Sequence, residues 1–167
     1  KGGNVQLGWR VKRLLVEGDR VIGIETGDGK TVSADQVVLA VPPLAAARLL
    51  QPHPALAETA ERLFRLSYES ITTVYLHYPE RTRLPSPMLG MVGTHAQWVF
   101  DRRLCGQPGL MAVVISADGP HVSMENHELI AAVSGEISRL LPGTPSPRHG
   151  AVIRERRATF ACEAGVD

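Results

Sequence analysis

A dense run of hydrophobic residues, VVLAV at positions 37–41, lies between Gln36 and the pair Pro42-Pro43. A short run that is apolar on both faces is typical of a strand covered on both sides, as in the parallel sheets of α/β domains. The two prolines should end this strand, because proline has no backbone N–H to donate. A helix over residues 44–50 is expected next. Since ligands of open α/β sheets bind beyond the carboxyl ends of strands, we expect a ligand at this point.

Upstream of this run, apolar and polar residues alternate through three short segments, 5–17, 20–26 and 31–34. Turn-forming residues separate them, Gly18-Asp19 in the first gap and GDGK at 27–30 in the second. Tight turns between alternating segments are typical of antiparallel hairpins. The sequence therefore predicts a β-meander that leads into the buried strand.

After residue 43 the pattern changes to helices and longer strands. A period of 3.6 predicts helices over 54–66 and over 123–141, the second capped by Ser123. Alternation predicts strands at 67–78, 88–92, 97–101, 110–117 and 149–161, and the very apolar 110–117 segment is expected at the centre of its sheet. We expect an α+β protein with two domains, residues 1–43 with the meander and buried strand, and residues 44–167 with a mixed, largely antiparallel sheet and flanking helices.

Composition narrows the function classes. The chain has 167 residues, of which 44% are hydrophobic, and its formal net charge is +1. This charge disfavours nucleic acid as a partner. Two cysteines without CxxC spacing, and no apolar stretch that could span a bilayer, favour a reducing, cytoplasmic location.

Sequence motifs of catalysis are scarce. The chain has no GxGxxG, GxxxxGK[ST], HExxH or GxSxG pattern, and its six histidines are scattered, so we expect no metal site and assign no catalytic residue. Trp98 and Phe100 share one face of their strand, and Tyr75 stands in a neighbouring strand. These three aromatics either wall an apolar ligand cavity or belong to the core. Arg154, Arg156 and Arg157 could bind a phosphate or a carboxylate. A solvent-facing row of Arg154 and Arg156 is favoured over this anion site, and Arg157 then points to the other face and needs a partner.

A family resemblance rests on GxxVxLGxxV at residues 2–11 together with VVLAVPP at 37–43. This pair of motifs resembles the flavin-containing amine oxidase and phytoene desaturase superfamily. The resemblance implies that the backbone of Val11 contacts the adenine end of FAD. It also implies that Ala40, Val41 and Pro42 pass near the cofactor before the chain enters the substrate domain.

Four later strings resemble the squalene-associated branch, which contains hydroxysqualene dehydroxylase: PMLG at 87–90, QWVFDR at 97–102, VVISA at 113–117 and RERRATFA at 154–161. The branch implies a FAD-dependent oxidoreductase that acts on a long isoprenoid, through reductive dehydroxylation of hydroxysqualene to squalene. Tyr75, Trp98 and Phe100 would then bind an apolar substrate. A carotenoid desaturase, an amine oxidase and a non-enzymatic binding module remain as alternatives.

Members of this superfamily also begin with a GxGxxG loop and close with a Gly-Asp motif that is followed by a helix, and neither occurs here. We therefore expect the chain to be the central piece of a longer protein, with residues 1–43 as part of a FAD-binding domain and residues 44–167 as the substrate domain. We expect this piece alone not to retain FAD, and the 37–41 strand to be more exposed than its composition suggests. Because squalene-like substrates dissolve in lipid, a peripheral membrane contact is a further expectation. The sequence does not give the oligomeric state.

Overall fold

The computed structural model describes residues 2–165, which form an α+β protein with two compact units. Unit 1 comprises the residues up to Leu66 and those from Cys162 onward, and unit 2 comprises Ser67–Ala161. The division at Leu66 differs from the boundary expected after residue 43. It lies later because the two helices that follow residue 43 pack on each other and the first contacts the meander.

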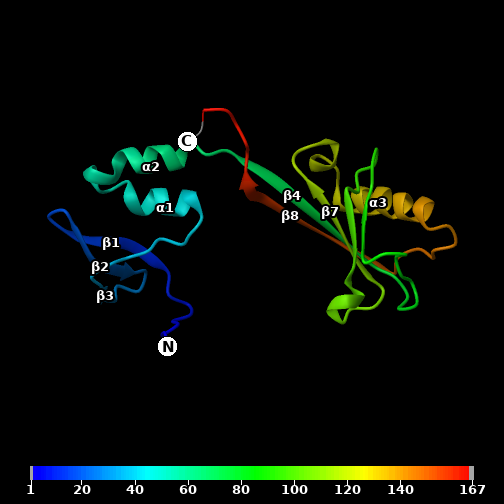
Figure 1. Ribbon diagram of the computed structural model, residues 1–167, viewed down its shortest axis with the longest axis horizontal. Coiled ribbons are helices and arrows are strands. Elements are labelled where there is room, and N and C mark those ends of the chain that lie inside the picture. The colour runs from blue at the N-terminus through cyan, green and yellow to red at the C-terminus, as the bar shows by residue number, and fades with distance from the viewer. Residues whose placement is uncertain (1, 166–167) are drawn as a thin grey trace. The chain divides into compact units, whose positions relative to one another are not determined.

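Unit 1 begins with the expected meander (Figure 1), in which strands β1 (Val11–Glu17), β2 (Arg20–Thr26) and β3 (Thr31–Ser33) pair antiparallel in that order. The first strand starts at Val11 instead of residue 5. Gly23 in β2 is required by a close approach of β3, since a Cβ at this position would lie 2.2 Å from the carbonyl oxygen of Val32. Its φ of 156° also favours glycine.

Helix α1 (Pro43–Leu50) follows directly, and Pro43 occupies its first turn, where a missing N–H costs nothing. The helix expected over 54–66 is a 3₁₀ turn η1 (Pro54–Leu56) followed by α2 (Ala57–Phe64). The small side chains of Ala47 and Ala60 are completely buried, which allows the two helices to pack closely.

The prediction of a buried strand at residues 37–41 is wrong. These residues adopt no regular secondary structure and pair with no strand of the described chain, and Val38 is 88% exposed. A strand covered on both sides needs neighbours that supply hydrogen bonds and apolar cover. Neither sheet of the described residues offers them here, so the run remains a connecting segment with an uncovered apolar surface.

Unit 2 contains one five-stranded sheet, with strands β4 (Tyr68–His77), β5 (Met88–Gly90), β6 (Trp98–Asp101), β7 (Leu110–Ser116) and β8 (His149–Phe160). The order is β5-β6-β7-β4-β8, and all four pairs are antiparallel. The central position of β7 confirms the prediction from its apolar sequence. The short 3₁₀ turns η2 (Arg102–Cys105) and η3 (Pro120–Val122) flank β7 in the sequence.

Helix α3 (Asn126–Leu140) covers one face of this sheet (Figure 1). Its buried side chains Leu129, Val133 and Ile137 join Val74 and Val113 in the core. The helix begins with a capping box formed by Glu125 and Glu128, and not at the predicted cap Ser123.

Arg154 corrects the expectation of a solvent-facing arginine row on β8. Its guanidinium donates to the backbone oxygen of Met124 at 2.9 Å and to the side chain of Asn126. It therefore ties β8 to the start of α3, while Arg156 and Arg157 are exposed.

Candidate functional site: the open face of the five-stranded sheet

The two faces of the sheet in unit 2 have different surroundings. Along β4, Thr72, Val74 and Leu76 are buried on the side of α3, whereas Thr73 and Tyr75 point to the opposite side and are half-buried. This alternation is the period of two expected for a strand. Within residues 67–161, no helix packs over this second side, which we call the open face.

Strand register brings the predicted aromatic residues together on the open face. Phe100 pairs with Ala112, and Ala112 pairs with Tyr75. Side chains that are directly opposite share a face, so Phe100 and Tyr75 flank Ala112 across three strands, about 10 Å apart. The small side chain of Ala112 between the two rings is only 6% exposed.

Trp98 lies one row further along the same face. It pairs with Val114 of β7 and with Gly90 of β5. The indole covers Gly90, because a Cβ there would lie 3.3 Å from the ring. Trp98 is nevertheless 44% exposed, so one side of a large apolar ring remains available to a ligand.

The two rows contain no ionisable side chain other than the phenol of Tyr75. Across β5-β6-β7-β4-β8, one row is Met88, Phe100, Ala112, Tyr75 and Ala151, and the other is Gly90, Trp98, Val114, Thr73 and Ile153. A face of this composition binds hydrocarbon by burying area and offers few directional contacts. Chemically, it can hold and align an apolar chain.

The residues expected to contact the cofactor all lie in unit 1. Val11 opens β1, which is an edge strand of the meander, so one edge of β1 pairs with no other strand among residues 2–165. Ala40, Val41 and Pro42 are exposed and lie in the connecting segment before α1. An unpaired strand edge and an uncovered apolar segment fit contacts with a flat heterocycle, which takes both backbone hydrogen bonds and apolar area.

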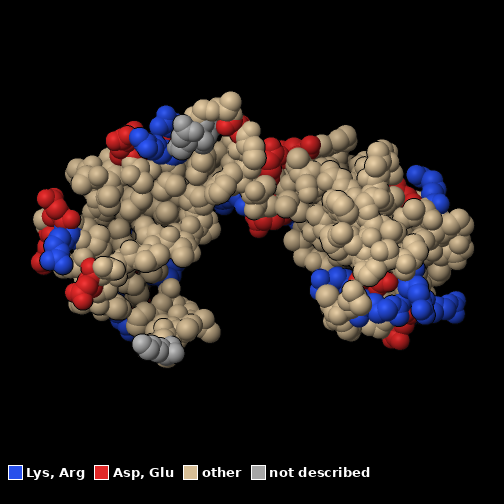
Figure 2. Space-filling model, in the orientation of Figure 1, with Lys and Arg blue, Asp and Glu red and all other residues tan. Residues whose placement is uncertain are grey.

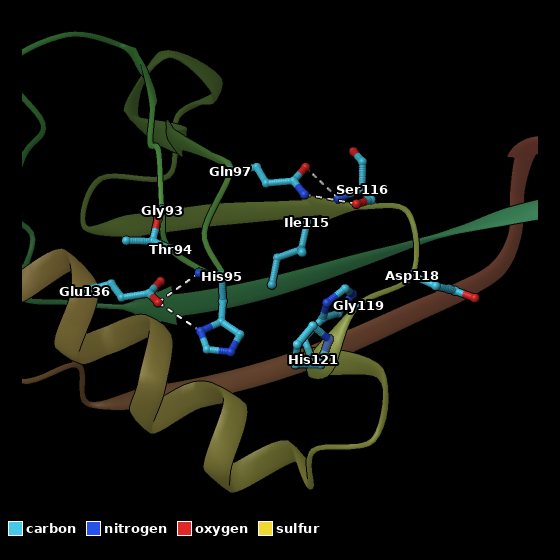
Figure 3. A pocket seen from close by; sticks show the side chains of 11 residues that line it. Gly93, Thr94, His95, Gln97, Ile115, Ser116, Asp118, Gly119, His121 and Glu136 are labelled. Carbon is cyan, nitrogen blue, oxygen red and sulfur yellow. Dashed lines mark hydrogen bonds and ion pairs between the residues drawn. The ribbon is translucent and has the colours of Figure 1, made fainter.

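A second, polar pocket of about 440 Å³ lies at the connection between β5 and β6 (Figure 3). Glu136 of α3 is almost fully buried there, and its carboxylate accepts three hydrogen bonds of 2.9 Å. The donors are the backbone N–H groups of His95 and Ala96 and the His95 imidazole. The carboxylate therefore fixes the segment that leads into Trp98.

Electrostatics in this pocket follow from burial and hydrogen bonding. Burial raises the pKa of Glu136, but the N–H donors of Ala96 and His95 and the His95 ring outweigh it, so that the pKa lies below its ordinary value. His121, only 4% exposed, has its pKa lowered by burial and by the nearby His95, while Asp118 acts in the opposite direction. The pocket thus holds an ionised carboxylate beside a histidine that favours the neutral form.

Sequence reasoning missed this pocket. His95 and Glu136 are far apart in the chain, and no motif or shared helical face links them. Within residues 2–165, no group of three or more His, Cys, Asp or Glu side chains could hold a metal ion. Of the same residues, no helix has the length and apolar character needed to cross a membrane.

Comparison with known proteins agrees with this architecture. The family model described as "Flavin containing amine oxidoreductase" matches residues 1–154. The chain belongs to this family. Among solved structures, similar folds occur in a putative protoporphyrinogen oxidase from Exiguobacterium, with a TM-score of 0.66, and in an oxidoreductase from Methanosarcina mazei, with a TM-score of 0.67. Their sequence identities are 18% and 16%, they cover 94% and 90% of this chain, and the chain covers 36% and 38% of theirs.

Two curated relatives are more similar in sequence. Hydroxysqualene dehydroxylase from Rhodopseudomonas palustris is 32% identical to this chain over 164 residues, and hydroxysqualene dehydroxylase from Sinorhizobium fredii is 27% identical over 168 residues. Each alignment covers 96% of this chain but only 36% or 35% of the relative. The chain resembles hydroxysqualene dehydroxylases and spans about a third of their length.

Proposed function

We propose that this chain is the central part of a FAD-dependent oxidoreductase that acts on a long isoprenoid, and that its reaction is the reductive dehydroxylation of hydroxysqualene to squalene. The curated relatives that carry this activity in their names support the substrate. Membership of a flavin-containing family supports the cofactor. In this proposal the open face of unit 2 is the wall that binds the substrate.

One observation carries the proposal: two full rows of the open face are mostly apolar, contain no charged side chain, and include the exposed ring of Trp98. A squalene-like chain has no charge and, apart from its hydroxyl group, no polar atom. It gains free energy by burial at about 25 cal/mol per Å² of apolar surface, and it needs no charged partner. Two uncharged rows suit such a chain better than they suit a charged substrate.

The chemistry assigns a modest role to the side chains. Reductive dehydroxylation replaces a C–O bond by a C–H bond, so the substrate gains a hydride and a proton and one water leaves. A bound flavin supplies hydride chemistry of this kind. Val11, Ala40, Val41 and Pro42 would hold the cofactor, and the residues of the open face would orient the isoprenoid and exclude water around it.

The experiment is a substrate comparison with the full-length protein that contains this chain. The protein is loaded with FAD and incubated separately with hydroxysqualene, a carotenoid precursor and a polyamine, with chromatographic detection of products. For hydroxysqualene, whose conversion to squalene is a reduction, the flavin is first reduced with dithionite under argon; for the other two substrates, whose reactions are oxidations, it is kept oxidised in air. We expect squalene from hydroxysqualene only. Turnover of the polyamine or the carotenoid precursor without squalene formation would contradict the assignment of substrate.

A further inference from the structure

One end of the five-stranded sheet gathers three connecting segments, at residues 78–87, 102–109 and 141–148. Hydrogen bonds between backbone groups join them, from Tyr78 N–H to the Gly109 oxygen at 2.8 Å and from Arg148 N–H to the His77 oxygen at 2.7 Å. The side chain of Arg103 adds bonds of 3.1 Å to the backbone oxygens of Glu80 and Thr82. These segments therefore form one continuous surface, which we call the basic end.

The basic end has a strong excess of positive charge, and Figure 2 shows arginine side chains gathered at this end of unit 2. Its cationic members are Arg81, Arg83, Arg102, Arg103 and Arg148, and its carboxylates are Glu80 and Asp101. The carboxylate of Asp101 is only 8% exposed and already accepts from the N–H groups of Leu84 and Arg103. Glu80 is thus the only acidic side chain that opposes the arginines at the surface of these segments.

An exposed apolar tip stands among these charges. Leu104 follows two arginines in η2 and is 77% exposed, and Met88 at the start of β5 is 47% exposed. The neighbouring Pro85 and Pro87 are exposed as well. A surface that combines arginines with protruding apolar side chains is typical of segments that rest in a membrane interface, where the cations meet phosphate groups and the apolar tips enter the acyl boundary.

Two features favour a membrane over other polyanions. A surface that binds single-stranded nucleic acid would expose aromatic rings for stacking on bases, and the three segments expose none. An exposed leucine gains no binding free energy from phosphate groups, whereas it does gain from burial among lipid chains. Met88 also belongs to the first row of the open face, so that the basic end is continuous with the apolar face. A substrate dissolved in lipid could pass from one to the other without crossing water.

We propose that the basic end docks this protein on an anionic membrane surface, with Leu104 inserted among the lipids and the arginines on lipid phosphates. The path of the substrate in this scheme rests on the proposed function, whereas the docking itself does not. Each arginine near an anionic leaflet contributes about 1 kcal/mol, which corresponds to about fivefold in affinity. Binding should therefore require anionic lipid and weaken with salt.

Flotation of the purified protein with vesicles tests the proposal without flavin or substrate. We expect binding to phosphatidylcholine vesicles that contain about one third phosphatidylglycerol, and at least tenfold weaker binding to phosphatidylcholine alone. The double variant Arg81→Glu/Arg83→Glu should lower binding more than tenfold. Leu104→Ser should lower it several-fold while the preference for anionic lipid persists.

A matched control is Arg156→Glu/Arg157→Glu, which makes the same change of charge on exposed arginines of β8, away from the basic end. This variant should bind vesicles like the unchanged protein. Equal losses in both double variants, equal binding to both kinds of vesicle, or tighter binding to double-stranded DNA than to anionic vesicles would each overturn the proposal. Thermal unfolding of each variant confirms that the fold is kept, and turnover in detergent solution reports separately on the proposed function.

Discussion

The buried carboxylate of Glu136 holds the connection between β5 and β6 in place. Both of its oxygens accept hydrogen bonds, from the backbone of His95 and Ala96 and from the His95 ring. An amide has only one accepting oxygen, so Glu136→Gln would turn an NH₂ group toward an N–H donor. We expect a loss of roughly 1–3 kcal/mol in the free energy of unfolding, measured by urea denaturation. Glu58→Gln, in an exposed ion pair of α2, should change it by less than about 1 kcal/mol.

The same carboxylate predicts a pH dependence. Because the folded-state pKa of Glu136 lies below its ordinary value, its stabilisation is complete above the ordinary value and is lost as the pH falls through the lower, folded-state pKa. Between about pH 5 and pH 2, the unchanged protein should therefore lose more stability than Glu136→Gln does. Parallel stability curves for the two proteins over this range would contradict the assignment.

Trp98 is expected to act on binding more than on folding. Its ring covers Gly90 but is 44% exposed, so Trp98→Ala should lower stability by about 1 kcal/mol and weaken isoprenoid binding about tenfold. Equilibrium binding of hydroxysqualene to the full-length protein measures this effect. Leu140→Ala, a similarly exposed apolar residue on α3, serves as the control, and an equal loss of affinity there would argue against a site on the open face.

At this scale, the sequence predicted part of the site. Alternation within one strand predicted that Trp98 and Phe100 share a face, because side-chain direction in a strand is a local property. It could not identify the partners of Glu136, since that contact depends on how α3 packs against the connection between β5 and β6. Arg154 was misjudged for the same reason, because its acceptors come from the residues just before and at the start of α3.

At the scale of elements, glycines define where strands approach. Because Gly23 of β2 has no Cβ, the carbonyl oxygen of Val32 in β3 can lie close to it. Gly23→Ala should therefore lower the free energy of unfolding by roughly 2–3 kcal/mol and disturb the meander. Gly135, in the interior of α3, has no atom closer than 3.8 Å to an added Cβ. Gly135→Ala should therefore stabilise by about 0.5–1 kcal/mol. Chemical denaturation of the two variants measures both changes in the free energy of unfolding. Destabilisation by Gly135→Ala would contradict the packing described for α3.

Most elements were predictable because periodicity reports burial on one side of a strand or helix. All four segments predicted to be strands between residues 67 and 117 are present, with shorter ends, and so is the 12-residue strand β8. The prediction for residues 37–41 was wrong because composition shows only that a segment suits a covered environment. It does not show whether neighbouring strands are present to cover it. The single helix expected over 54–66 is divided because Pro54 and the residues after it adopt a 3₁₀ turn.

At the scale of the molecule, the two units carry different parts of the proposed function. Unit 1 presents an edge strand and an uncovered apolar segment, and unit 2 presents the open face. Neither contains a glycine-rich loop of the GxGxxG type, which supplies most of the phosphate contacts in dinucleotide sites. We therefore expect the purified 167-residue chain to lack stoichiometric flavin, as judged by absorbance near the yellow flavin bands. Copurified flavin at one equivalent per chain would contradict this expectation.

Photoaffinity labelling tests most directly the claim that the open face binds the isoprenoid. The full-length protein is irradiated with an isoprenoid alcohol that carries a diazirine, and the labelled residues are identified by mass spectrometry, with unlabelled hydroxysqualene as competitor. We predict competed labels on β4, β6 and β7 at Tyr75, Trp98, Phe100 and their row neighbours. Labels confined to α3 or to other segments, or labels on the open face that excess hydroxysqualene does not reduce, would contradict the account.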